Sequence, residues 1–266
     1  MPPLAIIDAF TDTPFAGNPA AVCLLDRWPS DMWLQCVGRE MNLSETAFLV
    51  SRSGGEFELR WFTPKVEVAL CGHATLASAH LLWEHAKAGT VITFHTRKSG
   101  ALSAKRLESR EIELDFPARP ATPCDPPVGL LEALGAKAVA VGYNQDDYLV
   151  ELATAADVRT LAPDFARLAQ TQCRGVIVTA KSDDVRFDFV SRFFAPASGI
   201  NEDPVTGSAH CCLSEWWTGR IGKDEMTGYQ ASERGGVVRV VRVDGRVRLI
   251  GRAVTITRGE LLVPLG

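Results

Sequence analysis

The chain has 266 residues, of which 46% are hydrophobic and 23% are charged, and its net charge is −4. This composition is typical of a globular protein, and the length allows one large domain or two of about 130 residues. No basic stripe of the kind that binds nucleic acid is present, and no apolar stretch reaches the roughly 20 residues of a membrane helix. We therefore expect neither a nucleic acid nor a membrane as partner.

Cysteine usage and the amino terminus indicate the compartment. The seven cysteines form no Cys-x-x-Cys pair, and most of them lie in apolar surroundings, where a free thiol packs as a small hydrophobe. No charged segment precedes the first apolar residues, so no signal peptide is evident. These features favour a reduced, cytoplasmic protein without a metal site.

The first part of the chain predicts short strands around one amphipathic helix. Ser30 is a suitable N-cap for a helix whose apolar face includes Trp33 and Val37, and Asn42 is expected to end it. In the strand after the turn at 53–55, Phe57, Leu59 and Trp61 alternate with other residues, as is typical of a strand. The strands predicted in this part are 4–10, 20–25, 46–50 and 57–61.

Residues 73–85 form the first helix that we expect to be enclosed. Small and apolar side chains dominate it and no face is clearly polar, which is typical of a helix surrounded by other structure. Strands are predicted at 91–94, 101–107 and 112–116. The proline-rich segment 117–127 then predicts a linker. We place the boundary there, with an N-terminal half at 1–117 and a C-terminal half at 118–266, whose last strand is free to return to the first half.

The second half repeats this style. Thr154 and Asp157 predict a capping box, and Pro163-Asp164 predicts the start of another short helix. Glycine turns separate the short strands that follow the last helix. The elements predicted in this half are helices at 130–134 and 208–217 and strands at 138–141, 148–152, 176–180 and 187–194. The whole pattern predicts an α+β protein with mostly antiparallel sheets curled around one helix in each half.

An internal repeat relates the two enclosed helices. Phe62-Thr63-Pro64 precedes Gly72-His73-Ala74, and Phe194-Ala195-Pro196 precedes Gly207-Ser208-Ala209. A repeat near half the chain length predicts two similar domains. If they face each other, two helix N-termini point into one cleft, where their N–H groups form a site for an anion such as a carboxylate.

Three side chains are the candidates for chemistry. Glu45 is either a solvated carboxylate or, among its apolar neighbours, an enclosed group able to take and give a proton. His73 either caps or packs the first enclosed helix or faces out of its end. Asp203 either forms a structural Asp-Pro turn or contributes to the cleft. Ser208 is a first-turn hydroxyl in the simplest interpretation, and His210 is expected to pack inside its helix.

Long motifs resemble those of the PhzF family of phenazine-biosynthesis-like isomerases, and the match covers nearly the whole chain. The motifs are residues 8–20 (DAFTDTPFAGNPA), 41–46 (MNLSET), 71–77 (CGHATLA), 202–210 (EDPVTGSAH) and 230–236 (QASERGG). The resemblance implies a diaminopimelate-epimerase-like fold of two pseudo-symmetric halves, a homodimer and no cofactor.

The resemblance also implies a reaction. The best-understood member isomerises trans-2,3-dihydro-3-hydroxyanthranilate by moving a proton from one ring carbon to another. By motif, Glu45 is the proton shuttle, and His73 and Asp203 hold and polarise a small carboxylate substrate. The residues implied to bind substrate are Ser44, Gly72, Thr206, Gly207 and Ser208. The identity of the substrate stays open, and a chorismate-derived ring is the leading candidate.

Two other functions are weighed against this one. Fold relatives that racemise amino acids use two facing cysteines; here Cys71 occupies the first position but Thr206 occupies the second. A threonine hydroxyl has too high a pKa to replace a thiol, which argues against that mechanism. A non-catalytic binding protein on the same fold is the other alternative. Retention of Glu45, His73 and Asp203 argues against it, because a binder needs no proton shuttle.

Overall fold

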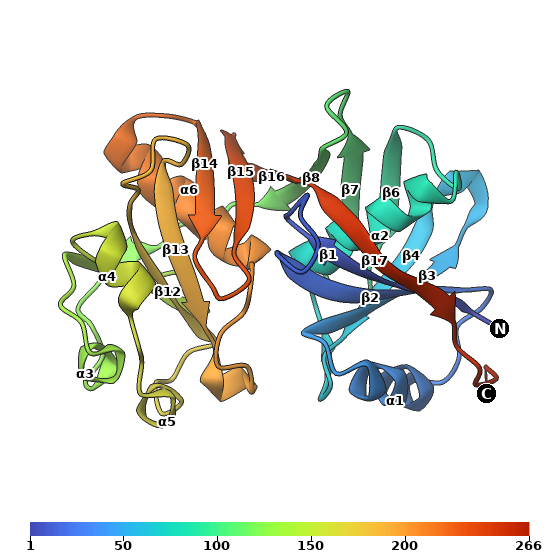
Figure 1. The fold of residues 1–266 in the computed structure, drawn as a ribbon, viewed down its shortest axis with the longest axis horizontal. Coiled ribbons are helices and arrows are strands. Elements are labelled where there is room, and N and C mark those ends of the chain that lie inside the picture. The colour runs from blue at the N-terminus through green and yellow to red at the C-terminus, as the bar shows by residue number, and fades with distance from the viewer. Residues whose placement is uncertain (266) are drawn as a thin grey trace. The chain divides into compact units, whose positions relative to one another are not determined.

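The computed structural model describes residues 1–265 and divides into two compact units (Figure 1). The first comprises Met1–Phe116 and Ile250–Gly266, and the second comprises Pro117–Leu249. The chain enters the second unit at the proline-rich segment and leaves it within strand β16. No helix among residues 1–265 combines the length and apolar character needed to cross a membrane.

The first unit is a mixed sheet in which most neighbours are antiparallel. Two pairs, β2–β3 and β4–β6, are parallel. Its strands are β1 (Pro3–Ala9), β2 (Asn18–Leu25), β3 (Glu45–Ser51), β4 (Phe57–Phe62), β5 (Glu67–Val68), β6 (Val91–His95), β7 (Ala101–Arg106), β8 (Ile112–Pro117) and β17 (Ala253–Glu260). The last strand, β17, pairs antiparallel with β1, so the two chain ends lie together in this unit (Figure 1).

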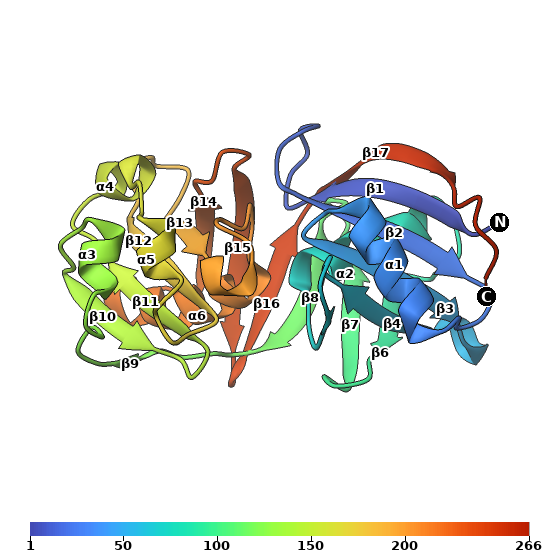
Figure 2. The ribbon, with the colours of Figure 1, turned by 90° about the horizontal axis from the view of Figure 1, so that it is seen from below.

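Helix α1 (Asp31–Met41) covers the outer face of this sheet (Figure 2). The Ser30 side chain accepts a hydrogen bond from the Trp33 N–H at 3.2 Å, and Asn42 ends the helix in a left-handed conformation, both as predicted. Leu34 and Val37 pack against side chains of β2, β3 and β4. As a result β4 is buried on both faces, although apolar and polar residues alternate over most of its sequence.

Helix α2 (Gly72–Glu84) forms the core of the first unit. The sheet curls around this helix, which therefore contacts the five strands β1, β2, β3, β7 and β17. Thr75 and Ser78 donate their hydroxyls to backbone carbonyls one turn earlier, which satisfies these buried polar groups within the helix. The prediction of an enclosed helix is confirmed.

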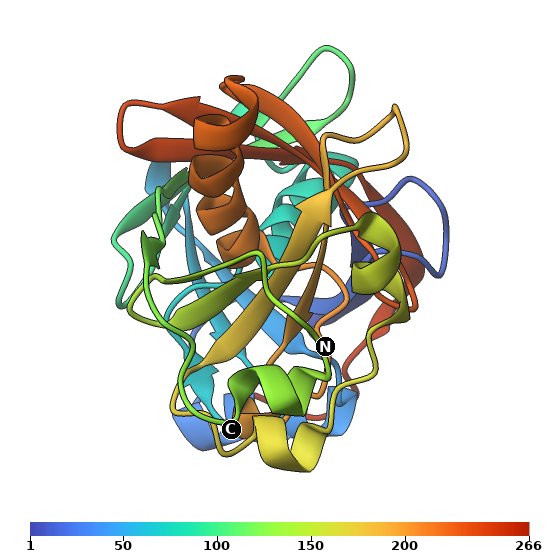
Figure 3. The ribbon, with the colours of Figure 1, turned by 90° about the vertical axis from the view of Figure 1, so that its left-hand side faces the viewer.

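The second unit has the same plan. Its strands are β9 (Thr122–Pro123), β10 (Ala140–Tyr143), β11 (Asp147–Glu151), β12 (Gly175–Lys181), β13 (Phe189–Phe194), β14 (Glu225–Gln230), β15 (Gly236–Val243) and β16 (Arg246–Gly251). Its helices are α3 (Leu130–Leu134), α4 (Ala155–Thr160), α5 (Phe165–Leu168) and α6 (Gly207–Ile221). Figure 3 faces this unit and shows α6 along its strands, with α3 and α5 at one end.

Helix α6 is the counterpart of α2. Trp217 donates its indole N–H to the Thr179 hydroxyl on β12 at 3.0 Å, and Trp216 donates to Glu151 on β11 at 2.9 Å. The helix continues to Ile221, four residues beyond the predicted end, because Gly222 provides the left-handed stop. The capping box at Thr154 is confirmed, with both of its hydrogen bonds present.

Strand directions show the repeat most clearly. In the first unit a parallel pair (β2–β3), an antiparallel pair (β3–β4), a parallel pair (β4–β6) and an antiparallel pair (β6–β7) follow one another. The second unit repeats that order in β11–β12, β12–β13, β13–β14 and β14–β15. The protein is therefore α+β, with two pseudo-symmetric halves built around α2 and α6. The segment predicted as a plain linker contains the short strand β9, which pairs with β10.

Candidate active site

Glu45 is the first residue of β3, where the parallel pairing with β2 places it opposite Ala20. Its side chain is 15% exposed, which places the carboxylate in a largely enclosed position rather than on an open surface. The preceding residue, Ser44, is half-buried in the short connection from α1. The local sequence sets this position, because Asn42 ends α1 and directs the chain into the strand.

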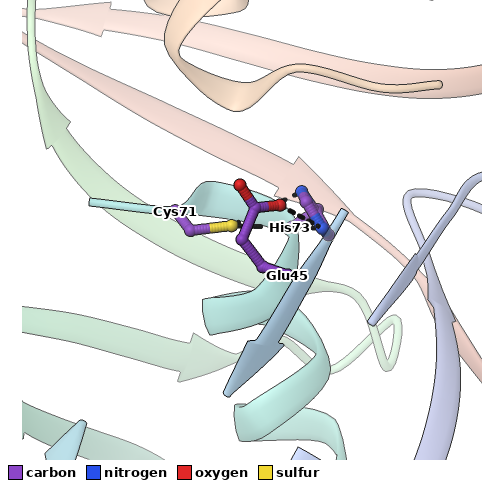
Figure 4. A group of neighbouring side chains, drawn as sticks. All are labelled: Glu45, Cys71 and His73. Atoms are coloured by element: carbon purple, nitrogen blue, oxygen red, sulfur yellow. Dashed lines mark hydrogen bonds and ion pairs between the residues drawn. The ribbon is translucent and has the colours of Figure 1, made fainter. Parts of the chain in front are cut away.

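His73 lies beside Glu45 at the start of α2 (Figure 4). The Nε2 atom of His73 is 3.3 Å from the Glu45 Oε2 atom, and the His73 side chain is 4% exposed. Burial lowers the pKa of His73 to about 3, so the ring is neutral near pH 7. The contact with Glu45 is therefore a hydrogen bond to a carboxylate from a neutral imidazole rather than an ion pair.

Asn18, at the start of β2, determines which ring nitrogen carries the proton. Its side-chain amide nitrogen is 3.1 Å from the Nδ1 atom of His73. An amide nitrogen only donates, so Nδ1 accepts and the ring proton resides on Nε2, the atom that faces Glu45. In the sequence, Asn18 is visible only as part of the motif at 8–20. The motif around it was visible, but its contact with His73 spans 55 positions.

Cys71 completes this group (Figure 4). Its Sγ atom is 3.5 Å from His73 Nδ1, and the side chain is buried. One donor atom from each of Glu45, Cys71 and His73 lies within 4.8 Å of the others, a spacing that allows a single metal ion to bind. Oxygen, sulfur and nitrogen ligands of this kind suit zinc. The absence of a metal from the reaction therefore stays a prediction.

A second group surrounds Asp203 in the loop before α6. The Thr206 hydroxyl donates to the Asp203 Oδ2 atom at 2.5 Å, and the Asp203 N–H donates to the Phe193 carbonyl at 3.0 Å. Gln230 lies fully buried behind the loop; it accepts from the Thr206 N–H at 2.9 Å and donates to the Asp203 carbonyl at 2.7 Å. These bonds hold the Asp-Pro turn rigidly against β13 and β14.

Arg174 brings a positive charge to the start of α6. Its guanidinium donates to the Ser208 hydroxyl at 3.0 Å and forms a two-pronged pair with Asp147, whose side chain is fully buried. Sequence reasoning missed Arg174, since no motif surrounds it and its partners lie 27 and 34 positions away. Asp147 balances the charge of Arg174, and the N–H groups of the guanidinium remain near the anion site that the helix start is expected to provide.

The two helix starts share one feature. Cys71 and Thr206 are the N-cap residues of α2 and α6, and neither side chain accepts a hydrogen bond from its helix. The first-turn N–H groups near Gly72 and Gly207 are therefore not capped by the side chains of their N-cap residues, as is also the case at anion-binding helix starts. His210, in the first turn of α6, is fully buried, as predicted. Its Nδ1 atom donates to the Thr206 carbonyl at 2.9 Å.

The predicted residues thus fall into two groups, one in each unit. Ser44, Glu45, Gly72 and His73 lie in the first, and Asp203, Thr206, Gly207 and Ser208 lie in the second. Within each unit the members are neighbours in the fold. The meeting of the two groups around one substrate stays a prediction.

The model of the family described as phenazine biosynthesis-like protein matches residues 7–259. The chain belongs to this family. An isomerase of Halalkalibacterium halodurans is 51% identical to it over 264 residues, which are 98% of each chain. Both comparisons cover all of the motifs that carry Glu45, His73 and Asp203.

Solved structures support the same assignment. A phenazine biosynthesis protein of the PhzF family from Enterococcus faecalis superposes with a TM-score of 0.93 and 39% identity, over 98% of this chain and 99% of the other. A probable proline racemase from Agrobacterium radiobacter has a TM-score of 0.64 at 14% identity, over 99% of this chain and 94% of the other, and shows the shared fold alone. Membership of the family and the isomerase names of relatives support an isomerase function for this chain.

Proposed function

We propose that this PhzF-like protein is an isomerase that moves a proton between two carbons of a small, cyclic carboxylate, with Glu45 as the acid and base. The observation that carries the proposal is the contact between the largely enclosed Glu45 carboxylate and the neutral His73, at 3.3 Å. A carboxylate held in this way keeps a fixed orientation toward a bound carbon acid. One group then performs both proton transfers on a single face of the substrate.

His73 has a positioning and polarising role in this mechanism. Its Nε2–H group donates a hydrogen bond, and the same donor is suited to an oxygen on which negative charge develops when a carbon next to a carboxyl or carbonyl group loses its proton. A neutral donor supplies this stabilisation without trapping the substrate in a permanent ion pair. Proton transfer of this kind contributes typically 10²–10⁴-fold to the rate, and positioning provides the remainder.

The second group supplies recognition of the substrate anion. The start of α6 offers first-turn N–H groups, the Ser208 hydroxyl and the nearby Arg174 guanidinium. All three favour a carboxylate over a neutral group, and the helix dipole adds about 0.3–1 kcal/mol. In this proposal Asp203, whose loop is held by Thr206 and Gln230, accepts a hydrogen bond from a hydroxyl or amino group of the substrate.

A screen of small cyclic carboxylates tests this function. The wild-type protein in heavy water should exchange a carbon-bound proton of at least one of them, as followed by proton NMR. The matched carboxamide should bind at least about tenfold more weakly, because charge-assisted hydrogen bonds are roughly twice as strong as neutral ones. A carboxamide that binds as tightly as its acid would contradict the recognition part, and a chain that exchanges no member of the set would favour a binding protein.

Cys71 distinguishes the proposed mechanism from cysteine racemisation. Thr206 is the residue equivalent to Cys71 in the internal repeat, and its hydroxyl donates a hydrogen bond to Asp203. Cys71→Ala should therefore keep most of the exchange activity found in the screen. A variant that loses at least about 10²-fold in rate while its fold is unchanged by circular dichroism would instead establish a thiol mechanism.

A homodimer without a bound cofactor completes the proposal, and neither point is needed for the chemistry above. Light scattering at micromolar concentration tests the dimer directly. Metal analysis of the purified protein tests the cofactor, since Glu45, Cys71 and His73 provide a donor set that suits zinc.

A further inference from the structure

A pocket in the first unit lies away from the start of α2 and contains an excess of positive charge. Its volume is about 330 Å³, and it is bounded by the last turns of α2, the β7–β8 hairpin and the beginning of β17. The charged side chains that line it are Asp12, Glu84, Arg106, Arg110 and Arg252. His80, also in its wall, is seven residues beyond His73 on α2, about 10 Å along the helix axis.

Within the described part of the chain, residues 1–265, the three arginines of this pocket have no carboxylate partner. Among residues 1–265, no ion pair or side-chain hydrogen bond involves the guanidinium of Arg106, Arg110 or Arg252. Four other arginines of the same unit, Arg52, Arg60, Arg97 and Arg258, each contact an acidic side chain. Three unpaired guanidinium groups around one pocket repel one another and leave positive charge to be matched by something else.

The acidic groups that line the pocket do not remove this excess. Glu84 already pairs with Arg258 at 2.7 Å and accepts a hydrogen bond from Thr255 at 2.6 Å. His80 adds no charge near neutral pH, since burial lowers its pKa. Asp12 is then the one acidic side chain in the pocket wall that remains to oppose the three arginines, and it accepts a hydrogen bond from Thr13 at 3.3 Å.

The backbone conformation at Arg110 is a second, independent indication that this pocket has a function. Arg110 lies in the turn between β7 and β8 with a φ of 65°, a left-handed conformation that favours glycine or asparagine. The turn is closed by hydrogen bonds between Leu107 and Glu111 and from the Arg110 N–H to the Leu107 carbonyl, each 2.9 Å long. A left-handed backbone conformation costs free energy at an arginine. A binding role for the Arg110 side chain in the pocket wall would explain why arginine occupies this position.

Apolar side chains form the rest of the wall. Trp83, Ile112 and Val254 line it, and the Trp83 indole N–H donates to the Gly89 carbonyl at 2.6 Å, which leaves the ring itself as an apolar surface. We infer that this pocket binds a small phosphate monoester, with the phosphate on the arginines and its organic part against Trp83. Three guanidinium groups suit a phosphate, which has three terminal oxygens and nearly two charges, better than a carboxylate with two oxygens and one charge.

Phenyl phosphate is the probe for this inference, and isothermal titration calorimetry with the full chain is the measurement. The wild type should bind it at millimolar or lower concentration in low salt and more weakly as salt is raised. Arg110→Gly suits the turn, so the variant should fold at least as well while binding at least about fivefold more weakly. Arg252→Gln should weaken binding by a similar factor.

Arg39→Gln is the matched control, because Arg39 is an exposed arginine of α1 without an ion pair among residues 1–265 and lies outside the pocket. It should bind phenyl phosphate like the wild type. Three results would overturn the inference: no binding to the wild type at millimolar probe, equal weakening by Arg39→Gln, or benzoate binding as tightly as phenyl phosphate. The inference does not depend on the proposed isomerase activity, and its failure would leave that proposal intact.

Discussion

Asn18 is the residue on which the protonation pattern of His73 depends. Its amide contacts Nδ1, and this leaves the ring proton on the nitrogen that faces Glu45. Side-chain partners of this kind commonly fix the tautomer of a histidine. Asn18 is thus a positioning residue that acts through His73.

Replacement of Asn18 by leucine should therefore alter His73 without removing it. Loss of the buried hydrogen bond should lower the free energy of unfolding by about 1–3 kcal/mol. Nitrogen-15 NMR of the His73 ring should show a change in the population of the two tautomers. An unchanged tautomer in a stably folded Asn18→Leu protein would show that Asn18 has no positioning role.

The buried histidines predict how stability depends on pH. Burial lowers the pKa of His73 to about 3 and that of His210 to about 4, from an ordinary value of 6.5. At pH values between the lowered pKa of each histidine and 6.5, the unfolded chain binds more protons than the folded protein does. The stabilisation is therefore complete above about pH 6.5 and is lost as the pH falls.

Urea unfolding at pH 7.5, 6 and 5 measures this effect. Each histidine should contribute a slope of up to about 1.4 kcal/mol per pH unit below pH 6.5. His210→Gln should remove the contribution of one histidine from the slope of unfolding free energy against pH. This holds whatever the effect of the substitution on stability at pH 7.5. An identical slope in the variant would show that His210 is not held neutral by the fold.

At the scale of elements, close packing between strands and helices sets the position of α6. Gly228 on β14 lies against Phe189, whose ring stacks on Trp217 of α6 at 6.1 Å between centroids. A Cβ atom at Gly228 would be 2.3 Å from the Phe189 ring, and that ring is fully buried. The glycine thus permits the sheet to approach the helix closely.

Gly228→Ala should consequently destabilise the protein by about 1–3 kcal/mol, the usual cost of overpacking a core. Gly259→Ala on β17 is the matched control, because no atom lies within 4 Å of the Cβ position there. Its effect should stay within about 0.5 kcal/mol. Equal shifts in the two melting temperatures would contradict the proposed contact.

Local signals in the sequence predicted many elements well, and tertiary contacts account for the differences. Ser30, Asn42 and Thr154 act through residues within four positions, so their caps and stops were readable. The covered outer face of β4 depends on α1, which folds back from an earlier part of the chain. Hydrophobic alternation within a strand contains no information about a helix that covers it.

At the scale of the whole molecule, the doubled Gly-x-Ala pattern was the most informative signal. It predicted two similar halves, and the strand directions of the two units repeat accordingly. Long motifs singled out Glu45, His73 and Asp203 as candidate site residues, and the structure brings Glu45 and His73 into contact within the first unit. Arg174 and Asn18 could not be assigned, since their roles arise from partners 27 or more positions away.

The role of Glu45 is the central claim, and proton exchange in heavy water by the Glu45→Gln variant tests it most directly. Glutamine keeps the shape and hydrogen bonding of the side chain but cannot transfer the proton. With a carboxylate that the wild type exchanges, the variant should bind comparably and exchange at least about 10²-fold more slowly. Glu40→Gln, an exposed glutamate of α1, should behave as the wild type. Exchange by Glu45→Gln at a rate near that of the wild type would contradict the account.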